Sequence, residues 1–545
     1  MINKVKSLFS DIVLQKKIKY FCTKLSRNRN LCGFNSINLD FLQENDKAKI
    51  IKDADRLCDG EYQIFNYPSY YIDNWNRDPV TGKKIKKKIS CLLIKTSAMY
   101  NKVDIKNYWD QSHLYALITL AEAYYFSKKE KYIKKIFNIL LTWQEENEVG
   151  KTINWKCPMN NAIRLANISA AMGIVQSTYF FRKYKTIVVE IIYKHILYII
   201  SNYEDKGEKP NNHLLSDLIG VIWGCVFLKK NFLLYEVDSI LDNALKKLCN
   251  EIERQVNKDG GDYENSSYYH CFVTEMISET ISMLYDNNIE FPNKLDDISK
   301  KMLGICEYLG VFDSFLPLFG DQDGSRLFLL QGFFDFNRCD FTSLNRFKRE
   351  YSTYLSAGIF RYDYKQYRVF VKCGGIGTDG KGTHDHNDQL SICLYIHNMP
   401  VIIDGGTYAY TFDTKARNIY RSEKKHSTIN ILNYPQNDIE SNIFAIKGNR
   451  KGRVLQNKTS FKGELVLSNI LTVSRSIFFE EDSIIIKDKI KGNTEEGIIT
   501  FLLPISIEKI ITIGKNIVKI ELDDKMLFYI QASSEIIVSK ENYSP

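Results

Sequence analysis

The stretch LYALITLAEAYY, residues 114–125, places apolar side chains three and four residues apart, which is the spacing of one helix face. The same spacing recurs at 234–248, and further helical windows lie near 162–175, 187–203, 214–228, 272–285 and 295–309. Short polar connections between such windows suit antiparallel neighbours. The chain from residue 46 to about 330 is therefore predicted to be a stack of helices, of the kind that commonly closes into a ring or arc.

From about residue 356 the pattern changes to short β-rich runs separated by turns. The runs include GIFRY at 358–362, RVFVK at 368–372, LSICLYI at 390–396 and SIIIK at 483–487. Many strands at this spacing predict an antiparallel sandwich or barrel. We therefore expect an N-terminal extension at 1–45, a helical domain at 46–345 and a β-domain at 346–545.

The composition indicates an ordinary soluble protein of 545 residues, with a net charge of +9 that would favour an acidic polymer without requiring one. The 12 cysteines contain no Cys-x-x-Cys pair, so neither a thiolate zinc site nor a disulfide framework is indicated. Residues 1–17 lack the apolar core of a signal peptide, and no apolar run is long enough to span a bilayer. The expectation is a cytoplasmic protein with no membrane span and no nucleic-acid partner, and a periplasmic or surface location stays open.

Three of the eight histidines fall in two short runs, GTHDHND at 382–388 and RSEKKHST at 421–428, on either side of VIIDGGTY at 401–408. Two imidazoles and a carboxylate are a common zinc ligand set, and His386, Asp404 and His426 supply one. His384 would then be left for other work. Taken alone, the region predicts a metal enzyme with a zinc-activated water.

Two further motifs precede helical windows: PNNHLLSD at 210–217 and DGGDYENSSYYH at 259–270. The polar side chains of the first would lie at a helix N-terminus, where anions are favoured. Each motif also has a structural interpretation, since Asn211 can cap a helix and Tyr269 can be a core aromatic with a satisfied hydroxyl.

The motifs together resemble the heparinase II/III-like polysaccharide lyases. The resemblance rests on Asn-Asn-His-Leu-Leu at 211–215, the 259–270 motif, Gly-Asp-x-Asp at 320–323, His-x-His-x-Asp at 384–388, Asp-Gly-Gly-Thr-Tyr-x-Tyr at 404–410 and Arg-Ser…His-Ser-Thr at 421–428. It implies an incomplete α/α toroid followed by an antiparallel β-sandwich, with a polysaccharide groove between them. It also implies cleavage of uronic-acid polymers by β-elimination.

The resemblance assigns roles to particular residues of this chain. Asn212 and His213 match the position that neutralises the uronate carboxylate, so that the C5 proton becomes removable. Tyr269 matches the catalytic tyrosine, expected here to be the base, and His384 matches its histidine partner. Because a phenol is a poor base, cationic neighbours should favour the phenolate. Those neighbours and the other substrate contacts are expected among His270, Arg417, Arg421 and Tyr410.

The resemblance further implies a structural zinc ion on His386, Asp404 and His426, with water or a substrate group completing four ligands. One departure is Asn160, where the family commonly has an acidic residue. The expected lack of a signal peptide would suit a role in the biosynthesis or trimming of a surface glycan. The identity of the acidic polysaccharide, endo or exo action and the oligomeric state stay open.

Two other classes of function compete with a lyase. A non-catalytic glycan-binding or assembly protein would keep the scaffold without turnover. A glycoside hydrolase on the same scaffold would use paired carboxylates, for which Asp262, Glu264, Asp321 and Asp323 are available.

Overall fold

The computed structural model describes residues 32–85, 90–205, 209–232, 237–313, 315–334, 339–492, 497–504, 509–522 and 526–539, with residues 16 and 20. Most of the extension expected at 1–45 therefore lies outside the described residues. The chain divides into two compact units, a helical unit (Met1–Asp262, His270–Glu307 and Gly324–Ser352) and a β-unit (Tyr263–Tyr269, Tyr308–Asp323 and Thr353–Pro545). Two short segments from the helical half of the sequence thus belong to the β-unit.

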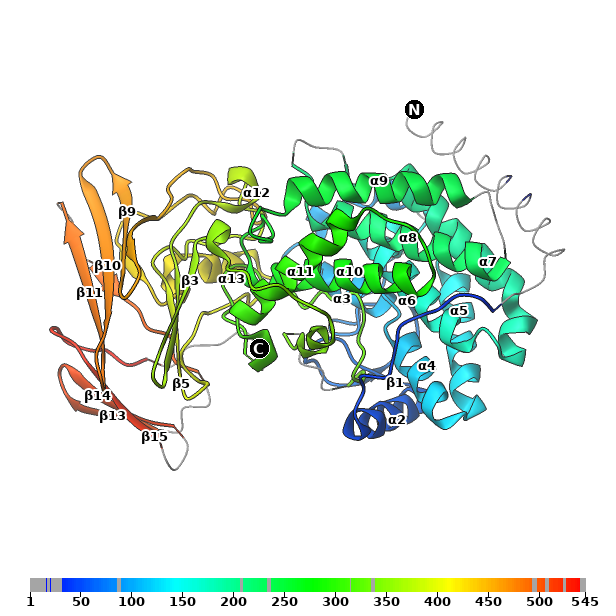
Figure 1. The fold of residues 1–545 in the computed structure, drawn as a ribbon, viewed down its shortest axis with the longest axis horizontal. Helices are drawn as coiled ribbons and strands as arrows, with labels where there is room; N and C mark the ends of the chain where they lie inside the picture. Colours follow the sequence, from blue (N-terminus) through cyan, green and yellow to red (C-terminus); the bar gives the residue numbers. More distant parts are fainter. Residues whose placement is uncertain are drawn as a thin grey trace. The chain divides into compact units, whose positions relative to one another are not determined.

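The helical unit is built from antiparallel helices that follow one another along the chain (Figure 1). They are α2 (Glu44–Asp59), α3 (Ile105–Ser112), α4 (Ala116–Ser127), α5 (Glu130–Glu146), α6 (Pro158–Val175), α7 (Tyr179–Ser201), α8 (Asn212–Phe232), α9 (Asp238–Gln255), α10 (Ser267–Asp286) and α11 (Asn293–Tyr308). A two-stranded antiparallel sheet joins β1 (Glu61–Tyr62) to β2 (Tyr70–Tyr71). Within the described helices, none is long and apolar enough to cross a bilayer.

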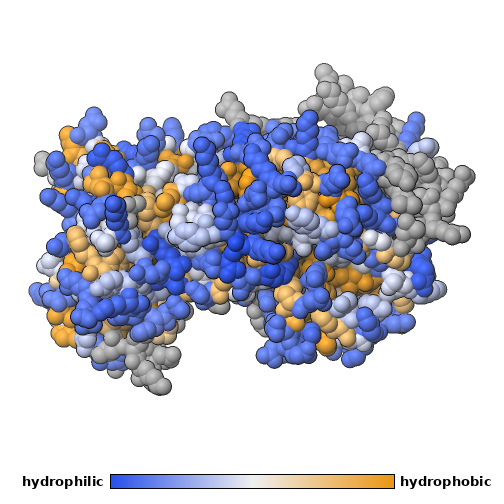
Figure 2. All heavy atoms as spheres, viewed as in Figure 1, coloured by the Kyte–Doolittle hydropathy of each residue, from blue (hydrophilic) through white to orange (hydrophobic). Residues whose placement is uncertain are grey.

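The faces that the helices bury follow the spacing of apolar residues in the sequence. Helix α9 buries one stripe, which includes Leu241, Leu245 and Leu248, whereas α8 is buried over almost its whole length. Helices α6 and α8 pack closely because Gly220 has no side chain: a Cβ there would lie 2.5 Å from the carbonyl oxygen of Ala162. On the visible face of the unit, hydrophilic residues predominate and hydrophobic ones form separate areas (Figure 2).

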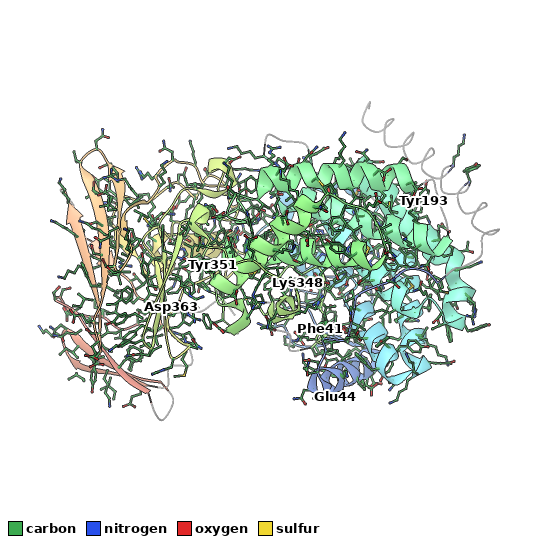
Figure 3. All side chains as sticks on the ribbon, in the orientation of Figure 1. Phe41, Glu44, Tyr193, Lys348, Tyr351 and Asp363 are labelled. Atoms are coloured by element: carbon green, nitrogen blue, oxygen red, sulfur yellow. The ribbon has the colours of Figure 1, made fainter. Side chains whose placement is uncertain are left out.

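Buried polar contacts tie the helices together. Arg164 on α6 is fully buried and donates hydrogen bonds to the His195 Nε2 on α7 and to the carbonyl oxygens of Ser112 and Asn154, each 3.0 Å away. These contacts satisfy a charge that would otherwise be costly to bury. At the edge of the unit, Phe41, which lies just before α2 and near Glu44 (Figure 3), packs under the Arg346 guanidinium, 4.3 Å from the ring centre.

The β-unit is a set of antiparallel sheets (Figure 1). Its strands are β3 (Ile359–Tyr364), β4 (Tyr367–Lys372), β5 (Ile392–Ile396), β6 (Met399–Ile402), β7 (Ile429–Ile431), β8 (Arg453–Asn457), β9 (Phe461–Ser468), β10 (Leu471–Phe479), β11 (Ile484–Lys491), β12 (Gly497–Ile499), β13 (Lys509–Gly514), β14 (Ile517–Leu522) and β15 (Met526–Gln531). The sheet orders are β3-β4-β5-β6, β11-β10-β9-β8, β12-β7 and β13-β14-β15. Two short helices, α12 (Gly377–Gly380) and α13 (Thr414–Arg421), lie in its connections.

One core joins the first two of these sheets. Val369 and Val371 on β4 share a buried cluster with Leu465 on β9 and Val473 on β10. Residues of β9 alternate between buried and exposed, as expected for a strand with one face on the core. The sandwich expected from the period-two runs is therefore formed.

Candidate functional site

The centre of the candidate site in the β-unit is a pair of stacked rings, Tyr269 and His384. Their centres are 3.7 Å apart and their planes differ by 15°. Tyr269 lies in the first turn of α10, where its backbone N–H donates to Ser266 Oγ over 3.1 Å. The Tyr269 hydroxyl donates to Asp323 Oδ2 over 2.6 Å, the length of a charge-assisted hydrogen bond.

Asp321 holds the other side of this pair and is the hub of the site. Its Oδ2 lies 2.9 Å from His384 Nδ1 and accepts a hydrogen bond from Arg417 Nη2 over 2.7 Å. Its Oδ1 lies 2.9 Å from His386 Nε2. Burial opposes the charge of this carboxylate, but Arg417 and the two histidines outweigh burial and hold the pKa of Asp321 well below its usual range. Asp321 is therefore an ionised carboxylate that fixes the orientation of two imidazoles.

The backbone brings Asp321 to this place through a close approach at Gly320. That glycine has φ +76°, and a Cβ on it would lie 2.6 Å from the carbonyl oxygen of His384. The same carbonyl oxygen accepts a hydrogen bond from the Asp321 N–H over 2.8 Å. Only glycine allows both the left-handed conformation and this contact at low cost.

His384 also faces a second carboxylate, since its Nε2 lies 3.4 Å from Glu264 Oε2. The segment that carries Glu264 is held by Lys372, which is fully buried on β4 and donates to the carbonyl oxygen of Asn265 over 2.8 Å. Lys372 is paired in turn with Asp385, 3.3 Å away. The His384 loop and the start of α10 are thus attached to the same strand.

The environment of Tyr269 differs from the expectation of a phenolate. Burial and then the Asp323 carboxylate raise the pKa of Tyr269 well above its ordinary value. Arg417 was expected to favour the phenolate, but its guanidinium is bound to Asp321 and to the carbonyl oxygen of Ile443. The Tyr269 side chain is therefore a neutral phenol that donates its proton to Asp323.

Three of the residues expected to contact substrate are buried and hydrogen-bonded within the protein. Arg417 is bound to Asp321, and Arg421 donates to the carbonyl oxygens of residues 439, 442 and 445. His270 lies in the helical unit, where its ring nitrogens lie 3.3 Å from the Asp262 N–H nitrogen and 3.0 Å from the Met302 carbonyl oxygen. Tyr410 alone is half-buried, with its ring 5.0 Å from that of Phe444.

The three predicted zinc ligands lie close together, but their ligand atoms do not all point at one common position. His386 and His426 are buried, with ring centres 5.3 Å apart, and each has one nitrogen without a hydrogen-bond partner: Nδ1 of His386 and Nε2 of His426. Leaving such a nitrogen unsatisfied costs about 1–3 kcal/mol. Burial lowers the pKa of His386 to about 4, so this imidazole is neutral at physiological pH, as a metal ligand must be.

Asp404 differs from the expected role in one respect. Its Oδ2 lies 2.9 Å from His426 Nδ1, and its Oδ1 accepts the Gly406 N–H over 3.0 Å. In this arrangement Asp404 orients His426 from behind, as carboxylates commonly do for metal-binding histidines. The other nitrogen of each ring lies against a carboxylate, Asp321 for His386 and Asp404 for His426.

In the helical unit, His213 and Asn212 occupy the first turn of α8. The His213 side chain is 31% exposed, and its Nδ1 lies 3.0 Å from Glu204 Oε1. Burial opposes a charge on this imidazole, but Glu204 outweighs it and raises the pKa of His213 well above its ordinary value. His213 is therefore a partly exposed cation, held in place by a carboxylate.

Asn160 is the residue that stands where the family commonly has an acidic one, and the structure shows its contact. It lies on α6, and its Oδ1 is 2.6 Å from His113 Nε2. An amide oxygen thus makes the contact for which a carboxylate would also be suited, and it does so without adding a charge to a buried site.

The sequence reasoning missed the roles of Asp321, Asp323 and Glu204. The first two belong to the Gly-Asp-x-Asp run, which contributed to the family resemblance and supplied candidate hydrolytic carboxylates, but neither aspartate was given a role in elimination. Glu204 lies in the connection after α7 and belongs to no motif.

Comparisons with known proteins agree with this architecture. Residues 2–335 match the family model described as heparinase II/III N-terminus, and residues 348–543 match heparinase II/III-like, C-terminal. A heparin-sulfate lyase of Bacteroides stercoris is 23% identical over 334 residues, which cover 56% of this chain and 47% of the relative. The chain therefore spans about half the length of that curated relative.

Solved structures show the same fold. A heparinase III structure matches with a TM-score of 0.64 at 15% identity and covers 96% of this chain and 83% of its own. The heparan sulfate lyase HepC of Pedobacter heparinus matches with a TM-score of 0.53 at 17% identity, over 95% of this chain and 80% of its own. The fold is an N-terminal incomplete α/α toroid followed by a C-terminal antiparallel β-sandwich, as expected. The two family models together cover nearly all of the sequence, and the chain belongs to the heparinase II/III-like family.

Proposed function

We propose that this protein is a carbon–oxygen lyase that cleaves a uronic-acid-containing acidic polysaccharide by β-elimination. The observation that carries the proposal is the stacked Tyr269–His384 pair, held by Asp321 and Asp323. Two proton-carrying side chains in fixed contact suit a reaction that removes one proton and delivers another. Two relatives are named heparin-sulfate lyase and heparan sulfate lyase, and their names support an acidic glycosaminoglycan-like substrate.

The neutral phenol of Tyr269 suggests how it would act as a base. Its hydroxyl proton already points at Asp323, so an oxygen lone pair stays available for the C5 proton of the uronate. As that proton arrives, the phenolic proton moves to Asp323, and no free phenolate is formed. The C4–O bond then breaks, a C4=C5 double bond forms, and the departing oxygen takes a proton, for which His384 is the proposed donor.

Recognition of the uronate carboxylate is the role proposed for His213 and Asn212. A positive imidazole lowers the charge of the carboxylate and so stabilises the enolate that develops when C5 loses its proton. Glu204 is the group that keeps His213 positive. Polar groups at a helix N-terminus add to this preference for an anion.

We further propose a structural zinc ion on His386 and His426, with Asp404 as an outer carboxylate or, after a change of rotamer, as a third ligand. The support is the pair of buried, unpartnered imidazole nitrogens. A bound ion would cross-link the 384–388 loop to the start of β7 and supply no chemistry to the elimination itself. The surface-glycan role and the location of the protein remain predictions.

The hydrolase alternative is less favoured because two of its four candidate carboxylates, Asp321 and Asp323, are already engaged. Asp321 is bound to Arg417 and two histidines, and Asp323 accepts the Tyr269 proton. A hydrolase needs one protonated carboxylic acid and one free carboxylate on either side of a glycosidic bond. These contacts leave Asp321 and Asp323 in neither of those states.

One assay separates the proposed classes. The purified protein is incubated with a panel of plain, N-acetylated and sulfated uronate polymers, and the ultraviolet absorbance of an unsaturated uronate is followed together with new reducing ends. Elimination gives both signals, hydrolysis gives reducing ends alone, and a binding protein gives neither. Reducing ends without the absorbance would refute the lyase proposal.

A further inference from the structure

The helical unit contains a second group of metal-ligand side chains, remote in sequence from the histidine cluster of the β-unit. Cys157 is the N-cap residue of α6, Glu204 follows the end of α7, and His213 lies in the first turn of α8. Their sulfur, oxygen and nitrogen atoms all lie within 4.8 Å of one another, and within the described residues no other such group of three or more is found. Three separate chain segments thus bring three different ligand types to one point.

The distances are close to those of a metal-bound set. His213 Nδ1 lies 3.0 Å from Glu204 Oε1, and Cys157 Sγ lies 3.7 Å from Glu204 Oε2. Around a tetrahedral zinc ion, bonds of about 2.0 Å to nitrogen or oxygen and about 2.3 Å to sulfur place ligand atoms roughly 3.3–3.8 Å apart. The two distances, which run to the two oxygens of the one Glu204 carboxylate, are therefore of the order found around such an ion, and all three ligand atoms lie within 4.8 Å of one another.

The surroundings hold the ligands in place without an ion. Glu204 Oε2 accepts the Met159 N–H over 3.0 Å, and the Glu204 N–H donates to Asp217 Oδ2 over 2.8 Å. Cys157 is buried, whereas the side chains of His213 and Glu204 are 31% and 28% exposed. An ion can thus enter from solvent, and the fourth position of a tetrahedron is open to water.

The ligand types select the ion. A thiolate, an imidazole and a carboxylate suit zinc and its neighbours, whereas magnesium and calcium prefer oxygen ligands alone. With the cysteine and the glutamate ionised, two negative charges would balance a divalent cation. We propose that Cys157, Glu204 and His213 form a binding site for a zinc-like divalent cation in the helical unit.

One consequence rests on the proposed function. A cation on His213 would take the imidazole that we propose for recognition of the uronate carboxylate. Occupancy would then inhibit the lyase, and removal of the cation would restore it. The metal site itself does not depend on this consequence.

The test uses cobalt as a spectroscopic substitute for zinc, with the full chain freed of metal by a chelator. Cobalt on a thiolate gives a near-ultraviolet charge-transfer band, which the thiolate-free set of His386, Asp404 and His426 cannot give. We expect the band in the wild-type protein, its displacement by zinc, and its loss in Cys157→Ser. Cys249→Ser, which removes a half-buried thiol of α9, should keep the band.

A second variant guards against misfolding of Cys157→Ser. Glu204→Gln should keep the thiolate band but weaken cobalt binding about tenfold or more, because a neutral amide replaces an anionic ligand. The proposal is wrong if the wild-type protein shows no thiolate band at saturating cobalt, or if the band survives in Cys157→Ser. Neither outcome depends on lyase activity, so a failed lyase assay and a failed metal site can be told apart.

Discussion

Replacement of Asp323 by asparagine tests the proton path proposed for Tyr269. The Tyr269 hydroxyl donates to Asp323 over 2.6 Å, and Asp323→Asn keeps the shape while removing the group that would receive the phenolic proton. Positioned acid–base groups contribute about 10²–10⁴-fold to rate, so the variant should lose about 3–5 kcal/mol of transition-state stabilisation. The loss should appear in kcat, with KM nearly unchanged, because Asp323 is not proposed to bind substrate.

The assay is the initial rate of unsaturated-uronate formation on the best substrate of the panel, for Asp323→Asn, Tyr269→Phe and the double variant. If the two residues act as one unit, the double variant should be no slower than the slower single variant. Asp363→Asn is the matched control, because this half-exposed carboxylate on β3 (Figure 3) pairs with Arg361 and Arg368, away from the Tyr269–His384 pair. Asp323→Asn with a rate within twofold of wild type, or multiplicative losses in the double variant, would refute the proton path.

Three other measurements test different parts of the structure. Asp321→Asn removes the carboxylate that neutralises buried Arg417 and should lower the free energy of unfolding by about 3–5 kcal/mol, measured by urea denaturation; a loss under 1 kcal/mol would contradict its role as hub. Burial, together with the charge of Arg164, holds the pKa of His195 well below its ordinary value. Below about pH 6.5, His195 therefore binds a proton in the unfolded chain but stays neutral in the folded chain. Stability should therefore decline with acid below that pH, and His195→Gln should reduce the slope; an unchanged slope in denaturation curves from pH 7 to pH 5 would contradict this. Chelation should lower the melting temperature of the wild type more than that of His426→Gln, which keeps the site proposed on Cys157, Glu204 and His213, and elemental analysis should show a lower zinc content in that variant, whereas equal zinc in both would exclude His426 as a ligand.

The fold class could be predicted from the sequence because it depends on periodicity. The 3.6-residue pattern before residue 330 and the two-residue pattern after residue 356 each report which side chains face a core, and that property is local. The small segments Tyr263–Tyr269 and Tyr308–Asp323 could not be assigned this way. They join the β-unit through individual contacts, such as the hydrogen bond between Lys372 and the Asn265 carbonyl oxygen. Such contacts produce no periodic pattern in the sequence.

The candidate site was predictable where a motif carried it and unpredictable where partners lie far apart in sequence. Tyr269 and His384, which belong to two separate motifs, are brought into contact. The arginines were expected beside Tyr269 and the substrate because cationic neighbours would favour the phenolate. Arg421 is buried instead, because carbonyl oxygens of the later segment 439–445 turn toward it. The sequence around residue 421 does not indicate that the segment 439–445 folds back against Arg421.

The two histidines of the His-x-His motif have separate proposed roles but a common support. Asp321 Oδ2 orients His384, and Asp321 Oδ1 orients His386, so one ionised carboxylate fixes both rings. Because the two oxygens belong to one rigid group, rotation of Asp321 to suit one imidazole would misplace the other. Arg417 opposes that rotation by holding Oδ2 from a third direction. The catalytic geometry proposed at His384 and the ligand geometry proposed at His386 are therefore coupled through Asp321, and a substitution at either histidine should disturb the other.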